Sequence, residues 1–236
     1  MLVEDRKEVE MAQATKRAIA EAKDVQFRSG AIQLNGDLSI PVGAQGVVLF
    51  AHGSGSSGHS PRNQFVARTI REQGVGTLLF DLLTKEEEAI DVHTAHLRFD
   101  IGLLAQRLID AAYWIKGEFD YLSIGYFGAS TGGGAALVAA AELGETVGAV
   151  VSRGGRPDLA GDALPEVTSP TLLIVGGLDY PVIEMNKEAL ARMRCEKELK
   201  IVPGATHLFE EPGTLQEVAR LAADWFQRHL HSVAAQ

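Results

Sequence analysis

Apolar runs alternate with segments of helical periodicity along most of the chain. Continuous apolar stretches are typical of strands that are buried on both faces of a sheet. Such stretches predict strands over residues 46–51, 75–83, 122–127, 147–152 and 171–175, and residues 198–202 are predicted as a further strand of mixed polarity. The intervening segments predict helices over residues 62–73, 98–116, 131–143, 183–193 and 214–230. This alternation predicts an α/β fold with a mostly parallel central sheet and helices on both faces.

The first part of the chain follows a different pattern. Residues 1–24 are charged and rich in alanine, with apolar residues at roughly helical spacing, which predicts an amphipathic N-terminal helical extension. Residues 25–41 resemble a pair of strands joined by a turn at Asn35-Gly36-Asp37. No linker or repeat divides the remainder, so residues 25–236 are expected to form a single domain. The extension could pack on that domain or on a second copy of the chain, which leaves a homodimer open.

Composition narrows the class of partner. Hydrophobic residues make up 46% of the 236 residues and charged residues 22%, as in ordinary globular proteins. The net charge of −9 disfavours nucleic acid and anionic membranes as partners. No apolar run reaches membrane-spanning length, and charged residues stand where a signal peptide needs an apolar core. We therefore expect a cytoplasmic protein that acts on a small molecule.

A glycine-rich turn joins one predicted strand to one predicted helix. It reads Gly128-Ala129-Ser130-Thr131-Gly132, a G-x-S-x-G sequence between strand 122–127 and helix 131–143. A nucleophilic serine on a sharp turn needs small neighbours, since larger side chains would collide with the adjacent backbone. The start of the helix also brings free N–H groups and partial positive charge to the serine. The alternative is a packing turn with an inert serine.

Two further candidates follow later strands. Asp179 comes after strand 171–175, and His207 comes after strand 198–202. Ligands of open parallel sheets bind at the carboxyl ends of the strands, where these residues should meet Ser130. The chain order of serine, acid and histidine is the order of a hydrolase triad. Taken singly, Asp179 could be a helix cap and His207 an ordinary loop histidine. Together they predict a catalytic triad of Ser130, Asp179 and His207.

An oxyanion also needs two N–H donors. One is expected from the backbone of Thr131, and the second from the loop His52-Gly53-Ser54-Gly55, for which Ser54 is the favoured donor. A phosphate-binding loop is the competing interpretation, but the segment lacks the lysine of that motif.

At these residues the sequence resembles the α/β-hydrolase superfamily, within it the dienelactone-hydrolase-like branch. The resemblance covers residues 25–230 and includes Gly177-Leu178-Asp179 and Gly204-Ala205-Thr206-His207. It implies a carboxylic-ester hydrolase that works through an acyl-enzyme without a cofactor. The sequence departs from dienelactone hydrolases proper, because serine replaces their cysteine nucleophile, and the single Cys195 lies elsewhere. A more general serine esterase is therefore favoured over an enzyme for dienelactone itself.

Weaker signals concern the substrate. The segment between strands 147–152 and 171–175 is too short for a large cap, so we expect little or no cap and small or short-acyl esters or lactones. Arg62 and Arg153 are candidates for binding a substrate carboxylate, with structural salt bridges as the alternative. A cluster of acidic and histidine side chains, Asp91, His93, His96 and Asp100, is interpreted as a solvated loop and not as a metal site.

Three functions are weighed. The favoured one is a carboxylesterase or lactonase. The second is an acyl- or thioester-transfer hydrolase with the same triad. The third is a catalytically silent binding protein on this fold, which the complete triad disfavours.

Overall fold

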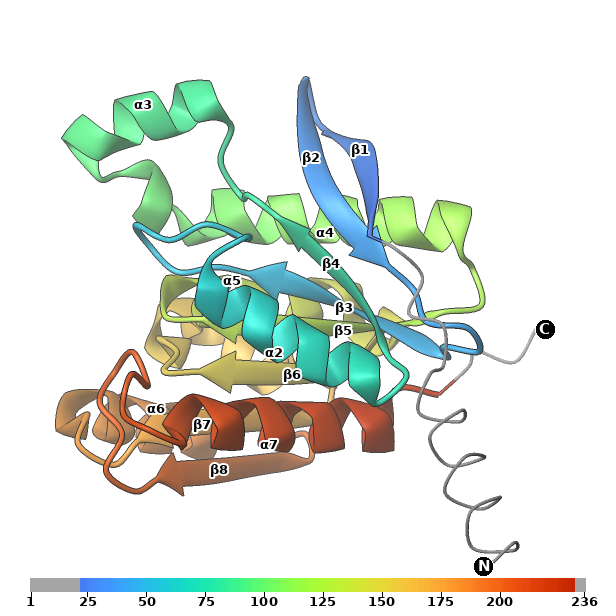
Figure 1. Cartoon of the computed structure of the whole chain (residues 1–236). Coiled ribbons are helices and arrows are strands. Elements are labelled where there is room, and N and C mark those ends of the chain that lie inside the picture. The colour runs from blue at the N-terminus through green and yellow to red at the C-terminus, as the bar shows by residue number, and fades with distance from the viewer. Residues whose placement is uncertain (1–21, 232–236) are drawn as a thin grey trace, which may run out of the picture.

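The computed structural model describes residues 22–231, in which an eight-stranded sheet carries helices on both faces (Figure 1). The strand order is β1-β2-β4-β3-β5-β6-β7-β8, and all neighbours from β4 to β8 pair in parallel. β1 and β2 pair antiparallel, as do β2 and β4. The strands are β1 (Lys23–Ser29), β2 (Ile32–Ser39), β3 (Gly46–Ala51), β4 (Gly76–Phe80), β5 (Ser123–Ala129), β6 (Val147–Arg153), β7 (Thr171–Gly176) and β8 (Lys197–Val202).

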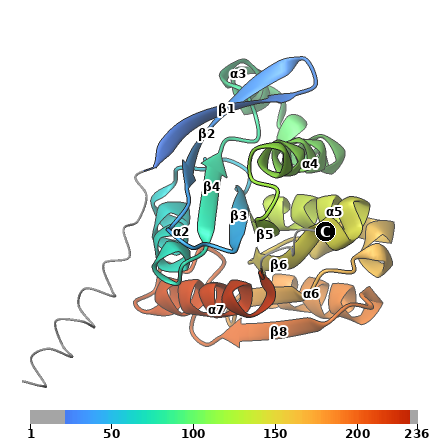
Figure 2. The same cartoon turned by 90° about the vertical axis from the view of Figure 1, so that its right-hand side faces the viewer.

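Two helical layers cover the sheet. Figure 2 shows α2 and α7 on one face and α4, α5 and α6 on the other. The α-helices are α2 (Pro61–Glu72), α3 (Lys85–Thr94), α4 (Ile101–Glu118), α5 (Thr131–Leu143), α6 (Tyr180–Arg192) and α7 (Thr214–His229). Short 3₁₀ segments are η1 (Leu97–Phe99), η2 (Gly144–Thr146) and η3 (Pro157–Glu166). The predicted α/β-hydrolase architecture is confirmed.

The central strands bury both of their faces. Alternate residues of β3 divide between two cores: Val47 and Leu49 pack under α4 and α5, whereas Val48 and Phe50 pack under α2 and α7. This two-sided burial is why the parallel strands read as unbroken apolar runs in the sequence. The alternation fixes the register of the sheet, because a one-residue shift would exchange the two faces of a strand.

The first hairpin differs from the prediction. The turn lies at Gly30-Ala31, where Gly30 has a φ of +57°, and not at Asn35-Gly36-Asp37. Gly36 lies inside β2 opposite Phe80, where an added Cβ would come within 2.9 Å of the Leu79 carbonyl oxygen. The glycine therefore permits close strand contact and does not form a turn. Of the predicted extension, residues 1–24, residues 1–21 lie outside the described part of the chain. Its last two residues, 23 and 24, belong to β1.

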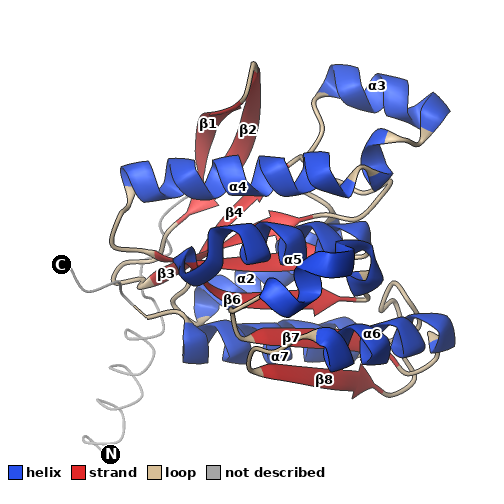
Figure 3. Ribbon diagram, turned by 180° about the vertical axis from the view of Figure 1, so that it is seen from behind, coloured by secondary structure: helices blue, strands red, loops and turns tan. Residues whose placement is uncertain are grey.

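A second difference is α3. The sequence was interpreted as a solvated segment around Asp91, but residues 85–94 form a helix that projects from the body of the molecule (Figure 3). The segment between β6 and β7 carries only η3, in agreement with the expectation of little or no cap. Within residues 22–231, no helix combines the length and hydrophobicity needed to cross a bilayer.

Candidate active site

Ser130 lies at the sharp turn between β5 and α5. Its φ of +51° and ψ of −121° lie outside the regions that residues with a side chain normally adopt. Such a conformation costs about 1–3 kcal/mol and persists only where the surroundings impose it. Here the Ser130 N–H donates to the Arg153 carbonyl at 3.3 Å, and the Ser130 carbonyl accepts from the N–H of Gly133 and of Arg156, each at 3.0 Å. The loop after β6 therefore helps to hold the turn.

The glycines of the motif are required by close backbone contacts. A Cβ on Gly128 would lie 2.5 Å from the Gly132 carbonyl oxygen, and one on Gly132 would collide with the Ala51 carbonyl. Gly53 in turn lies against Ser130, since its added Cβ would be 3.0 Å from the serine Cβ. The start of α5 is thus pressed onto β3 and β5, which directs Ser130 to the carboxyl end of the sheet.

Asp179 and His207 form the second part of the site. Asp179 follows β7 at the start of α6, and His207 lies in the loop after β8. The His207 Nδ1 and the Asp179 Oδ2 are 2.6 Å apart. The carboxylate is largely buried, with 13% of its side chain exposed, whereas the imidazole is 38% exposed. An Nδ1–H bond to the carboxylate leaves Nε2 as the nitrogen that can accept a proton.

The loop after β6 connects this pair with the serine. Gly154 follows Arg153, whose carbonyl binds the Ser130 N–H. An added Cβ on Gly154 would lie 3.2 Å from the His207 carbonyl oxygen and 3.6 Å from its ring Cε1. One short segment therefore contacts both the backbone of Ser130 and the ring of His207. The three predicted triad residues come from the ends of β5, β7 and β8, at the same edge of the sheet.

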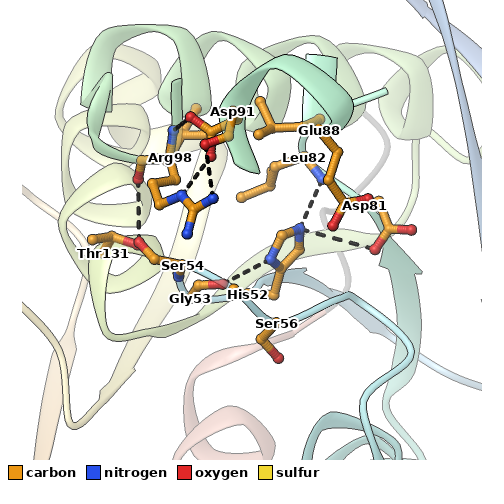
Figure 4. A pocket seen from close by; sticks show the side chains of 13 residues that line it. His52, Gly53, Ser54, Ser56, Asp81, Leu82, Glu88, Asp91, Arg98 and Thr131 are labelled. Atoms are coloured by element: carbon orange, nitrogen blue, oxygen red, sulfur yellow. Dashed lines mark hydrogen bonds and ion pairs between the residues drawn. The ribbon is translucent and has the colours of Figure 1, made fainter. Parts of the chain in front are cut away.

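The predicted oxyanion residues also lie together (Figure 4). The Ser54 N–H donates to the Thr131 Oγ1 at 3.2 Å, and the two hydroxyl oxygens are 3.0 Å apart. The Ser54 hydroxyl further donates to the Arg98 carbonyl at 3.4 Å. The loop after β3 is thereby attached to the first residue of α5.

His52 fixes the same loop from its other side. Its Nδ1 is 3.0 Å from the Gly53 carbonyl, and its Nε2 accepts the Leu82 N–H at 3.0 Å. Burial lowers the pKa of His52, which keeps the ring neutral and allows Nε2 to remain an acceptor. The residue therefore acts as a structural link between the loops after β3 and β4.

A small pocket opens beside Ser54 and Thr131, below α3. It encloses about 470 Å³ of empty space, including its open mouth. Besides the loop residues 52–56, it is lined by Asp81, Leu82, Leu83, Glu88, Asp91, Arg98, Leu104 and Thr131. The pocket borders the proposed oxyanion donors and is a candidate for part of the substrate site.

Asp91 at this pocket corrects the interpretation of a solvated loop. Its side chain is buried, and its carboxylate accepts from the N–H groups of Leu97 and Arg98 at 2.7 and 3.1 Å. It also pairs with the Arg98 guanidinium at 2.5 Å. Asp100 caps the N-terminus of α4 by accepting the Leu103 N–H. These carboxylates thus organise the chain between α3 and α4. Among residues 22–231, no group of three acidic, histidine or cysteine side chains could hold a metal ion.

Arg153 is the buried cation of the site. Its side chain is only 8% exposed, and its guanidinium lies 5.8 Å from the ring centroid of Phe209, two residues after His207. Desolvation and, to a smaller extent, the neighbouring charge of Arg62 together lower the pKa of Arg153 to about 10. Within the described part of the chain, Arg153 has no carboxylate at ion-pair distance, whereas Arg62 pairs with Glu210 at 3.3 Å. Arg153 therefore has an unmatched positive charge.

Sequence reasoning missed Phe209 and the roles of Asp91 and Arg98. Phe209 has a φ of +56° although it is not glycine, and it is buried. Nothing in a single sequence marks a phenylalanine for such a conformation. For Asp91 and Arg98, the only indication in the sequence is that two opposite charges lie seven positions apart.

Comparison with known proteins identifies the family. The model of the dienelactone hydrolase family matches residues 36–235, which is most of the chain. The chain belongs to the dienelactone hydrolase family. A crystal structure of a dienelactone hydrolase from Anabaena variabilis is 60% identical, with a TM-score of 0.88 over 89% of this chain and 99% of that one. The more distant Est1E from Butyrivibrio proteoclasticus, 17% identical, shares the fold with a TM-score of 0.72 over 87% of this chain and 98% of that one.

Curated relatives bear another name. Proteins of two Mycobacterium tuberculosis strains, called "Putative phosphoribosyl transferase", are 56% identical over 210 residues, or 88% of this chain. The match covers 46% of their length, so the chain spans about half the length of the curated relatives it matches. That name was therefore given to proteins in which about half of the sequence has no counterpart in this chain. The dienelactone hydrolase family match, over residues 36–235, concerns the part that this chain shares with those proteins.

Proposed function

We propose that this member of the dienelactone hydrolase family is a serine esterase that hydrolyses small carboxylic esters or lactones through an acyl-enzyme. The observation that carries the proposal is Ser130 in its strained turn, joined through one loop to the His207–Asp179 pair. A serine needs a base, and the base needs an orienting carboxylate. The small pocket beside Thr131 favours short acyl groups.

Each residue has one role in the reaction. The Ser130 Oγ forms a bond to the carbonyl carbon while His207 Nε2 takes its proton. The N–H groups of Thr131 and Ser54 stabilise the resulting oxyanion. As the C–O bond of the ester breaks, His207 returns the proton to the leaving alkoxide. Water then attacks the acyl-enzyme by the same route, and Asp179 stabilises the His207 cation in both steps.

The test compares wild type with Ser130→Ala and Cys195→Ser on p-nitrophenyl acetate, butyrate and octanoate. We expect Ser130→Ala to lose at least about 10³-fold in kcat, by analogy with other serine hydrolases. Cys195→Ser should keep its activity, because burial raises the pKa of this thiol and it lies outside the site. A fluorophosphonate should label Ser130. Equal activity of wild type and Ser130→Ala, with no labelling, would contradict the proposal.

We also propose that Arg153 binds an anionic group of the substrate, with the charge of the neighbouring Arg62 adding to the attraction. An unmatched buried guanidinium is costly, and a substrate carboxylate would supply the missing charge through charge-assisted hydrogen bonds. Arg153→Met should lower kcat/KM for a p-nitrophenyl hemisuccinate by about 10- to 100-fold and leave the acetate ester unaffected. Arg228→Met is the matched control, since Arg228 also lies over an aromatic ring, at 4.9 Å from that of Trp225. An equal loss on both esters would refute the role of Arg153.

A further inference from the structure

A chain of hydrogen bonds connects the Thr131 side chain with the loop after β3. The Thr131 Oγ1 lies 3.2 Å from the Ser54 N and 3.0 Å from the Ser54 Oγ, which itself donates to the Arg98 carbonyl. The Thr131 residue, which follows Ser130 in the chain, is only 3% exposed, yet it lines the pocket next to Ser54. Its hydroxyl is therefore oriented by neighbours before any substrate arrives.

These contacts limit the directions that the two hydroxyl protons can take. A hydroxyl has one proton to donate and two lone pairs to accept with. The Ser54 hydroxyl can give its one proton to the Arg98 carbonyl at 3.4 Å or to the Thr131 Oγ1 at 3.0 Å. The Thr131 oxygen accepts the Ser54 N–H, so its own proton is available for donation. When the Ser54 proton goes to Arg98, the Thr131 proton points to the Ser54 Oγ.

The expected oxyanion donors indicate where the hydroxyl lies relative to the reacting carbonyl. The Thr131 N–H belongs to the residue after the nucleophile, and the Ser54 N–H is the second expected donor. An oxyanion that reaches the Ser54 N–H must lie close to the oxygen that this N–H already contacts at 3.2 Å. Such a long hydrogen bond can be shared between two acceptors.

We propose that the Thr131 hydroxyl is a third oxyanion donor, in addition to the backbone N–H groups of Thr131 and Ser54. The inference rests on the proposed serine-hydrolase function. When the carbonyl oxygen becomes negative, the hydroxyl proton turns from the Ser54 Oγ to the oxyanion, while the Ser54 N–H keeps the hydroxyl oriented. The exchange of a neutral acceptor for an anionic one strengthens this bond in the transition state, which accelerates the reaction.

The experiment uses Thr131→Val, which keeps the branched shape and the backbone N–H but removes the hydroxyl. We expect kcat for p-nitrophenyl acetate to fall by about 10²-fold, as for loss of one oxyanion donor, with KM changed by less than about threefold. Thr131→Ser should recover most of the lost kcat. Thr131→Ala and Thr131→Ser form a second pair that differs by a single oxygen, in case valine disturbs packing.

A transition-state analogue separates catalysis from packing. An alkylboronic acid forms a tetrahedral adduct with the serine and places an oxygen at the oxyanion position. Its affinity should weaken in Thr131→Val by the same factor as kcat, whereas KM should not. Unchanged kcat in Thr131→Val, or equal losses in kcat and in substrate binding, would overturn the role of the hydroxyl. If the activity of the wild type depends on Ser130, either of these results contradicts the role of the Thr131 hydroxyl but not the proposed function. If the wild type has no activity that depends on Ser130, both the proposed function and the role of the hydroxyl are contradicted.

Discussion

At the scale of single residues, the strained turn at Ser130 depends on contacts that leave no room for a methyl group. Gly132→Ala should destabilise the protein by about 3 kcal/mol or more, because its Cβ would collide with the Ala51 carbonyl and neither backbone can move freely. Gly117→Ala is the matched control. Gly117 is an exposed residue of α4 with no atom near its added Cβ, so alanine should stabilise by about 0.5 kcal/mol. Urea unfolding of both variants measures the difference, and equal stabilities would contradict this account.

His52 should make stability depend on pH. Burial lowers its pKa in the folded state below the usual 6.5, so folding keeps the ring neutral. The stability that this neutral link contributes is complete above pH 6.5 and is lost as the pH falls from there towards the lowered pKa. The slope should reach at most about 1.4 kcal/mol per pH unit. The charged and titratable groups that face the ring are Asp81, Glu88 and His59.

The test of this link is His52→Gln, whose amide can still accept the Leu82 N–H but does not titrate. The variant should lose about 1–2 kcal/mol at pH 8 and show a flatter decline of unfolding free energy between pH 7 and pH 5. His229 also has a pKa lowered by burial, and it contributes equally to both proteins. Identical slopes for wild type and variant would exclude His52 as the source.

The sequence predicts some residues of the site better than others, for a physical reason. Ser130, Asp179 and His207 each follow a strand of the predicted parallel sheet, so their positions at one edge of the sheet come from the fold class alone. Asp91 and Phe209 depend on tertiary contacts instead. Asp91 is buried because Arg98 and two N–H groups satisfy its charge, and polar residues of this kind look solvated when read singly.

At the scale of elements, α3 shows why the segment around Asp91 was interpreted as a loop. Asp91 is its single buried residue, so the helix has no apolar stripe to reveal it. Its clearest signal is a capping box: the Thr84 hydroxyl accepts the Glu87 N–H at 3.1 Å, and the Glu87 carboxylate accepts the Thr84 N–H at 2.8 Å. The Arg107 guanidinium also binds Glu87 at 2.7 Å. Local capping, more than burial, holds α3 in place.

Loss of the cap should therefore loosen α3 alone. Thr84→Ala should cost about 1 kcal/mol and raise amide exchange of residues 85–94 by roughly fivefold, with little effect on the central strands. Thr94→Ala is the control, because the Thr94 hydroxyl bonds only near the exposed end of the helix. Hydrogen exchange followed by mass spectrometry measures both. Faster exchange throughout the sheet in Thr84→Ala would show that α3 supports the whole fold.

At the scale of the whole molecule, the two faces of one sheet each carry a large hydrophobic core. Trp114 in α4 stacks on Phe27 at 5.5 Å on one face, whereas Trp225 in α7 is buried on the other and donates to the Pro170 carbonyl at 3.3 Å. Adjacent residues of β3 pack into opposite cores. Unfolding of β3 would therefore expose apolar side chains of both cores at once. The antiparallel hairpin of β1 and β2 extends the same sheet through β4.

We therefore expect the described domain to unfold as one cooperative unit, although it exceeds the size at which two-state behaviour is usual. Trp114→Phe leaves Trp225 to report on one face, and Trp225→Phe leaves Trp114 to report on the other. In each variant, the urea midpoint from tryptophan fluorescence should coincide with the midpoint from far-ultraviolet circular dichroism, even if the substitution shifts both. A lower fluorescence midpoint in Trp225→Phe alone would mean that α4 and the first hairpin separate before the rest. The continuous strand pairing from β1 to β8 argues against that order. The hairpin belongs to the same sheet as β5, which leads to Ser130, and the hairpin, α4 and β5 contribute side chains to the same core.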